Sequence, residues 1–188
     1  VNADTGVMTL EASVVATAST ANYPRAVSVW ENTDGGYTVN WSNYSGAGEY
    51  SIVFNANNTV KTAQASVGTA GAFTGTGATV DTGSGTEARF EVDKPYNSTT
   101  VRIIKINADG TSTDLGVQSL TGGGGNSQTM FSARVPQATG LDKTYVYSPD
   151  GGVAYAYELS STGTLTYIGQ YTVTGVVSTS SSADVYVN

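Results

Sequence analysis

Apolar and polar side chains alternate along many short stretches of this chain, with the period of β-strands that bury one face. The longest such stretch covers residues 7–18, where small apolar side chains fall on one face and Thr, Glu and Ser fall mostly on the other. Its apolar positions are Met8, Leu10, Ala12, Val14 and Ala16. Shorter stretches follow, separated by Gly, Pro, Asn and Asp, which favour turns. The pattern predicts an all-β chain with an extended N-terminal strand.

One hairpin turn recurs at nearly constant spacing. Asn107-Ala108-Asp109-Gly110 predicts a type I turn followed by a left-handed residue, because Gly accepts a positive φ without a Cβ clash. Gly163 ends a similar turn, and Asn58 takes this position in a fainter copy. The copies lie 52 and 53 residues apart, as β-propeller blades do, but 188 residues hold fewer than the four blades that propellers need. We therefore expect an internal duplication within a sandwich.

A local resemblance supports the sandwich. Within residues 37–60, Val39-x-Trp41 followed by Tyr50-x-Ile52 resembles the B and C strands of fibronectin type III and immunoglobulin-like modules. The resemblance implies that Trp41 fills the core between two sheets and that Tyr50 begins the next strand. We expect an antiparallel β-sandwich, Ig-like or jelly-roll-like, over residues 24–188. Residues 1–23 are expected to form a separate extended segment, since Pro24 breaks the alternation.

Residues 68–88 are rich in Gly, Thr and Ala. This composition predicts a flexible excursion, with Thr-rich edge strands that carry Gly at bulges as the alternative.

The composition excludes several classes of function. The chain has no Cys and no His, so it lacks thiolate chemistry, the usual general base and the commonest metal ligand. Its net charge is −7 with only 8 basic residues, so nucleic acid is not an expected partner. No stretch is long and apolar enough for a membrane-spanning helix. The chain begins at Val1, and we expect a mature protein whose leader has been removed.

Candidate acid–base chemistry is limited to carboxylates. Glu91 and Asp93 lie two apart on one face of a predicted strand, and we expect both to be solvated at the surface. No motif of an activated Ser nucleophile is present. We therefore expect no catalytic residues, no cofactor and no enzyme activity.

Calcium binding and a Lys–Asn crosslink are two further candidates, and ordinary structural roles explain the residues of both. The oxygens of Asn107, Asp109 and Asp150 could bind Ca²⁺, but the spacing of a calcium loop is missing and turn formation explains them, so no metal is expected. The second candidate is an isopeptide crosslink between a Lys and an Asn side chain, which is known in surface β-sandwich modules. Its candidate lysines are expected instead to be ordinary exposed side chains; they are Lys61, Lys94, Lys105 and Lys143.

Four Asn-x-Ser/Thr triplets are candidate N-glycosylation sites: Asn40, Asn43, Asn57 and Asn97. Asn57 and Asn97 fall in predicted turns, where a glycan can project. Glycosylation would make the protein an extracellular glycoprotein.

These features together favour a structural role outside the cell or at its surface. We expect a subunit of a pilus-like extracellular filament or a surface layer, in which the N-terminal strand is donated to the next subunit. The partners would be copies of the same chain, with surface glycans as a further candidate. The alternatives are a secreted carbohydrate-binding or adhesive β-sandwich module, and a viral capsid, tail or decoration protein.

Overall fold

The computed structural model describes residues 24–43, 48–68, 74–95, 98–122, 130–150 and 152–172. These residues form twelve strands in three four-stranded antiparallel sheets, and the described ranges contain no helix. The expected all-β antiparallel fold is thus confirmed. The expected N-terminal strand over residues 7–18 and the boundary at residue 23 lie outside the described residues.

In every sheet the strands are hydrogen-bonded in the order in which they follow one another along the chain. The first sheet contains β1 (Pro24–Glu31), β2 (Tyr37–Asn43), β3 (Glu49–Phe54) and β4 (Val60–Gly68). The middle sheet contains β5 (Thr74–Asp81), β6 (Glu87–Lys94), β7 (Thr100–Ile106) and β8 (Ser112–Ser119). The third sheet contains β9 (Phe131–Val135), β10 (Lys143–Asp150), β11 (Val153–Leu159) and β12 (Leu165–Thr172).

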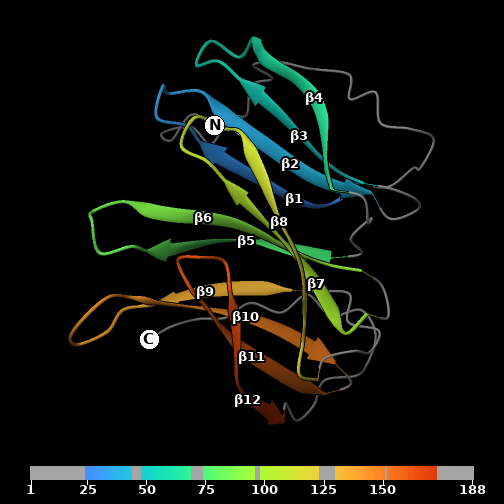
Figure 1. Ribbon diagram of the computed structural model, residues 1–188, viewed down its shortest axis with the longest axis vertical. Coiled ribbons are helices and arrows are strands. Elements are labelled where there is room, and N and C mark those ends of the chain that lie inside the picture. Colours follow the sequence, from blue (N-terminus) through green and yellow to red (C-terminus); the bar gives the residue numbers. More distant parts are fainter. Residues whose placement is uncertain are drawn as a thin grey trace, which may run out of the picture.

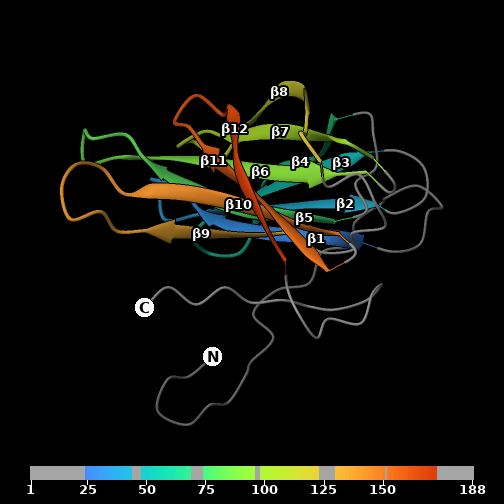
Figure 2. The same cartoon turned by 90° about the horizontal axis from the view of Figure 1, so that it is seen from below.

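The three sheets are stacked, with the middle sheet between the other two (Figure 1). Strand β5 contacts β1 of the first sheet and also β9 and β10 of the third sheet, while β4 contacts β8. Figure 2 shows that β1, β5 and β9 lie toward one side of the molecule and β8 toward the other. The sheets are therefore three similar layers, and both faces of the middle sheet are covered.

The predicted turn is confirmed in all three sheets. Gly110 and Gly163 have φ of 88° and 83°, and Asn58 has φ of 65°. In each turn the amide of this residue donates to the carbonyl three positions earlier, for example Gly110 to Asn107 at 3.0 Å. The turns join β3 to β4, β7 to β8 and β11 to β12, so the 52- and 53-residue spacing marks one structural repeat per sheet.

The main hydrophobic core lies between the middle and third sheets. Phe90 and Val92 of β6 pack there with Tyr157 and Leu159 of β11, and all four are buried. Each such side chain contributes roughly 1.5–3 kcal/mol by transfer from water, before the entropy cost of folding.

A second apolar cluster lies on the first sheet and includes Trp41 with Ile52 and Phe54. Trp41 stacks on Tyr50 of the next strand, with ring centroids 5.7 Å apart. The described residues packed around Trp41 in this cluster all belong to β2 and β3. The resemblance implied that Trp41 fills the core between two sheets, and this expectation is wrong: in the described part of the chain its cluster contains only residues of β2 and β3 and is separate from the core between the middle and third sheets. Tyr50 does lie on the next strand, β3, as expected.

The Gly- and Thr-rich stretch forms strand β5, so the expectation of a flexible excursion over 68–88 is wrong for Thr74–Asp81 and the alternative of an edge strand is right. One glycine there has a packing role. A Cβ on Gly77 would lie 2.8 Å from Cζ2 of Trp30 in β1, so a side chain at this position would push the first sheet away.

Candidate functional site

The five residues predicted to form the donated strand, Met8, Leu10, Ala12, Val14 and Ala16, lie outside the described residues. The structure therefore leaves their pairing as a prediction.

The candidate glycosylation sites fall in different surroundings. Asn57 lies exposed in the β3–β4 turn, where its Oδ1 accepts a hydrogen bond from the Thr59 hydroxyl at 2.6 Å. Asn40 lies in β2 and is only 4% exposed, so a glycan on it would not fit into the folded protein. Asn43 ends β2, and Asn97 lies outside the described residues. Asn57 is therefore more accessible than Asn40.

The expectation that Glu91 and Asp93 are solvated is wrong. Both side chains lie on the face of β6 that meets the first sheet, and they are 2% and 1% exposed. Glu49 of β3 is buried on the opposite side of this interface. The sequence pattern showed that Glu91 and Asp93 share a face. It did not show that another sheet would cover that face, because the covering residues are distant along the chain.

One arginine accompanies these three buried carboxyl groups, which we call the acidic cluster. Nε of Arg102 lies 3.8 Å from Oε2 of Glu49, and Arg102 also pairs with Asp114. The Ser28 hydroxyl of β1 donates a hydrogen bond to Glu91. Within the described part of the chain, Oε1 of Glu91, Oδ1 of Asp93 and both carboxyl oxygens of Glu49 accept no hydrogen bond.

Burial makes the charged forms of these groups unfavourable. It raises the pKa of Glu49 to about 7, against the attraction of Arg102. Burial likewise raises the pKa of Glu91 to about 8, although the hydrogen bond from Ser28 opposes the rise. The pKa of Asp93 is raised well above its usual value by burial and by the neighbouring Glu91 and Glu49. The cluster therefore holds protons near neutral pH.

Carboxyl groups with such pKa values are suited to proton transfer, but a substrate would need access to them. Asn40, Glu49, Glu91, Asp93 and Ile104 line a pocket that has no room for a water molecule in this conformation. The cluster thus forms a polar contact between the first and middle sheets.

Among the candidate calcium ligands, Asp109 has a structural role in its turn. No group of three or more acidic side chains in the described ranges is arranged to hold a metal ion. Oδ1 of Asp109 accepts hydrogen bonds from the amide and hydroxyl of Thr111, at 2.9 and 2.7 Å, which confirms its predicted role in the turn.

The candidate lysines differ from one another. Lys61 pairs with Asp34 at 2.5 Å and Lys143 with Glu158 at 3.0 Å, and Lys105 is exposed, so the expectation holds for these three. It is wrong for Lys94, which is 0% exposed at the end of β6. Burial lowers the pKa of Lys94, and the charge of Asp150 opposes this effect.

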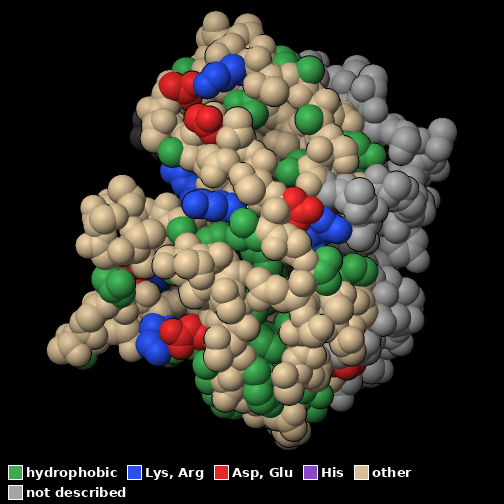
Figure 3. Space-filling view, viewed as in Figure 1, with side chains coloured by type: hydrophobic (Ala, Val, Ile, Leu, Met, Phe, Trp, Pro, Cys, Tyr) green, Lys and Arg blue, Asp and Glu red, His purple; other side chains and the backbone are tan. Residues whose placement is uncertain are grey.

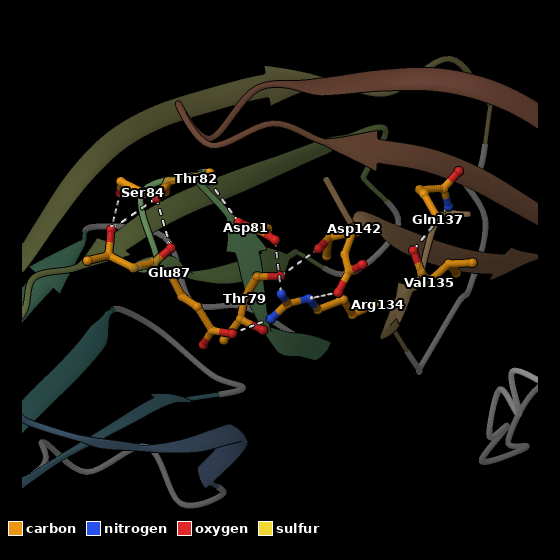
Figure 4. A network of polar contacts seen from close by, with 12 residues as sticks. Thr79, Asp81, Thr82, Ser84, Glu87, Arg134, Val135, Gln137 and Asp142 are labelled. Carbon is orange, nitrogen blue, oxygen red and sulfur yellow. Dashed lines mark hydrogen bonds and ion pairs between the residues drawn. The ribbon is translucent and has the colours of Figure 1, made fainter. Parts of the chain in front are cut away.

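A polar network joins the middle sheet to the third sheet at one end of the stack. Arg134 of β9 reaches toward Asp81 and Glu87 of the β5–β6 hairpin and toward Asp142 next to β10 (Figure 4). Its Nε lies 2.9 Å from Asp142 and one terminal nitrogen lies 3.3 Å from Asp81. Three carboxylates around one guanidinium hold these hairpin ends together.

The third sheet carries an aromatic surface on its side away from the middle sheet, and we call this surface the third-sheet end face. Phe131 of β9 stacks on Tyr147 of β10 with ring centroids 5.2 Å apart, and Tyr145 lies 6.4 Å from Tyr147. Tyr171 of β12, which is 60% exposed, influences the pKa of Tyr147, which burial raises. Figure 3 shows hydrophobic side chains gathered over the lower part of the molecule, where Figure 1 places β11 and β12.

The first sheet carries a corresponding apolar surface on its side away from the middle sheet, which we call the first-sheet end face. Val29 of β1 pairs with Val39, which pairs with Ile52, so these side chains share this face. Val29 is 63% exposed, and Val60, opposite Phe54, is also exposed. Neither end face was predicted from the sequence. A usable signal was Tyr145-Val146-Tyr147, which is apolar on both faces of one strand.

Comparison with protein-family models, curated protein sequences and solved structures found no match to this chain. No long apolar helix of the kind that crosses a membrane occurs in the described ranges.

Proposed function

We propose that this protein is the repeating structural subunit of a pilus-like extracellular filament or a surface layer, a homopolymer in which each subunit donates its N-terminal strand to a neighbour. The observation that carries the proposal is the presence of apolar surfaces at both ends of the sheet stack. Stacked repeats that remain single molecules need polar faces at their two ends. Here the two ends carry exposed Val29 and Tyr171 instead.

Open sheet edges add support. Strand β12 has β11 as its only described neighbour in the sheet, and its Tyr167, Ile168 and Tyr171 are exposed. An edge with unpaired backbone groups and apolar side chains can accept an added strand. Residues 7–18 have the alternation and the small apolar side chains that such a strand needs.

The extracellular setting rests on the candidate glycans and on the composition. Asn57 is exposed in a turn, which is a suitable place for a glycan if the protein passes through a secretory route. Glycans on neighbouring surfaces would be additional partners.

The third-sheet end face also favours a second function, a carbohydrate-binding or adhesive module. Phe131, Tyr145 and Tyr147 form a row of aromatic rings, and such rings can stack on the apolar faces of sugars. Tyr147→Ala would then abolish binding in a glycan-array assay, whereas Tyr167→Ala on β12 would leave binding unchanged.

Electron microscopy and size-exclusion chromatography of the purified full chain test the filament. We expect filaments or sheets from the full chain, and soluble monomers when residues 1–20 are deleted. Leu10→Asp should weaken assembly more than Glu11→Ala, because the two residues lie on opposite faces of the predicted strand. A full chain that stays monomeric at high concentration, with deletion and substitutions having no effect, would reject the proposal.

A further inference from the structure

Because each sheet is one copy of the repeat, residues at the same distance from the left-handed turn position are equivalent in the three sheets. Equivalent residues then show which surfaces the end faces correspond to. Counting back six residues from the left-handed turn position gives Ile52, Ile104 and Tyr157 in the three sheets. Ile104 shares its face of the middle sheet with Glu91, which bonds Ser28 of the first sheet. Tyr157 packs into the core against the middle sheet. In both sheets this position therefore faces the preceding sheet.

Ile52 occupies the same position in the first sheet and lies on the first-sheet end face, where its own side chain is 6% exposed and Val29 on the same face is 63% exposed. No preceding sheet exists for it among the described residues. The first-sheet end face is thus equivalent to the surface of the third sheet that packs on the middle sheet.

The opposite faces follow the same rule. Val92 of the middle sheet pairs with Ile103, and both are buried beneath the third sheet. Tyr147 pairs with Ala156, which stands at the position of Ile103 counted from the turn. Tyr147 therefore occupies the place of Val92, but on the third-sheet end face, where no described sheet follows.

The contact between the middle and third sheets thus supplies a template for a contact between two molecules. We propose that the third-sheet end face of one copy packs on the first-sheet end face of the next copy, so that the stack continues from molecule to molecule. The contact is heterologous, because different surfaces meet, and such contacts build open filaments or closed rings. This inference deepens the proposed function and rests on it for the open, filament form.

The two charged groups named on the third-sheet end face do not oppose the contact. Lys143 and Glu158 flank Tyr145 on the third-sheet end face and are paired with each other at 3.0 Å. Their charges are therefore balanced within one copy. The remaining named members of this face are aromatic or Ala. On the first-sheet end face, the exposed Glu31 lies opposite Tyr37 at the end of β1, so the contact must leave this carboxylate in water or pair it with a cation.

The template also selects two positions that should meet. Ser132 of β9 lies opposite Val146, which in turn lies opposite Tyr157, so Ser132 faces the middle sheet. Thr76 of β5 lies opposite Val92, so it faces the third sheet. The hydroxyls of Ser132 and Thr76 are 3.4 Å apart across the two sheets. By the repeat, Val29 corresponds to Ser132, because it lies opposite Val39, the partner of Ile52.

Phe131 lies opposite Tyr147 and therefore corresponds to Thr76. We thus expect Val29 of one copy to lie beside Phe131 of the next.

Cysteine crosslinking tests this expectation cleanly, because the chain has no Cys of its own. Val29→Cys protein is mixed with Phe131→Cys protein and oxidised under conditions in which the unmodified protein is assembled, and circular dichroism confirms that each variant folds. We expect a disulfide-linked pair in the mixture. Thr76→Cys with Ser132→Cys in one chain is the positive control, and Val117→Cys on exposed β8 mixed with Phe131→Cys is the negative control.

Each outcome decides the inference. A mixed pair without a Val117 pair supports it, and a particle of two copies carrying this crosslink would support the stacking while rejecting the filament. Filaments without the mixed pair would reject the stacking and keep the filament, as expected if the donated strand alone joins the copies. Crosslinks of Val29→Cys only with itself would reject the heterologous contact. The absence of both crosslinks and filaments would reject both proposals.

Discussion

Ser28 of β1 donates a hydrogen bond to Glu91 of β6, and this contact connects the first sheet to the middle sheet through the acidic cluster. Trp30 supports it from the same strand, since its Nε1 donates to the Ser28 hydroxyl at 3.0 Å. Glu49 and Asp93 are buried nearby with Arg102 as the adjacent cation. The interface between these two sheets is thus more polar than the core on the other side of the middle sheet.

The acidic cluster predicts that the protein loses stability as the pH rises. In the unfolded chain a Glu ionises near pH 4.5, whereas in the folded protein the pKa values of Glu49 and Glu91 are about 7 and 8. Between these values the folded state binds more protons, so the free energy of unfolding falls from about pH 4.5 to about pH 8. Urea denaturation at pH 5 and pH 8 measures this change, and a higher stability at pH 8 would contradict it.

Glu91→Gln assigns the effect to one residue. The amide cannot ionise, and its oxygen can still accept the hydrogen bond from Ser28. We expect the variant to be more stable than the unmodified protein at pH 8, by more than about 1 kcal/mol, and to differ little at pH 5. Glu158→Gln, at a surface ion pair, is the matched control and should leave the pH dependence unchanged.

The second prediction compares alanine substitutions at Gly110 and Gly116, which distinguish the cost of backbone strain from the cost of a steric clash. Gly110 and Gly116 have similar φ of 88° and 90°. A Cβ on Gly110 would lie 2.5 Å from the Thr38 hydroxyl of the first sheet, whereas a Cβ on Gly116 would meet no atom within 4 Å. Gly116→Ala should therefore cost only about 1–2 kcal/mol of backbone strain.

Gly110→Ala should cost about 1–3 kcal/mol more than Gly116→Ala, because the first sheet must also move. Thermal or urea unfolding of both variants measures the difference. Equal losses would show that the β7–β8 turn does not press against the first sheet.

The local features of this fold were predictable from sequence because neighbouring residues determine them. Asn58, Gly110 and Gly163 were identified as left-handed turn positions, since the required φ restricts the residue type. The strand Thr74–Asp81 is harder to predict, because its Gly77 is explained by close contact with Trp30, a residue far away in the chain. Alternation gave the strands, but it did not give the number of layers.

The candidate site depended almost entirely on contacts between distant residues. The sequence places Glu91 and Asp93 at the surface, because neither neighbouring sequence suggests a desolvated cleft. The first sheet covers that face, and nothing near Glu91 in the sequence indicates this. Lys94 was misjudged for the same reason. Tyr145 and Tyr147 alternate with a buried Val146, so an apolar outer surface could have been noticed directly.

The Arg134 network gives a third prediction. Removing the guanidinium leaves Asp81, Glu87 and Asp142 close together without their cation. We expect Arg134→Met to lower the free energy of unfolding at low salt, and to lower it by less in 1 M NaCl, where repulsion between the carboxylates is screened. Lys143→Met, which breaks a single exposed pair, should cost less at either salt concentration. A loss for Arg134→Met that does not change with salt would indicate packing by its aliphatic part instead.

Phe90 and Tyr145 occupy equivalent positions in the middle and third sheets. Substitution of Phe90 should lower the stability of the monomer, whereas substitution of Tyr145 should mainly weaken assembly. Phe90 is fully buried between two sheets, so Phe90→Ala should cost about 3–5 kcal/mol in any state of assembly. Tyr145 lies on the third-sheet end face, where we propose that a neighbouring copy completes its burial. Tyr145→Ala should therefore cost less than about 1 kcal/mol in the dilute monomer, as surface substitutions usually do. It should nevertheless raise the protein concentration needed for assembly. Urea unfolding at low concentration and light scattering over a concentration series measure the two effects. A large loss of monomer stability from Tyr145→Ala, with assembly unchanged, would show that the chain itself covers this face.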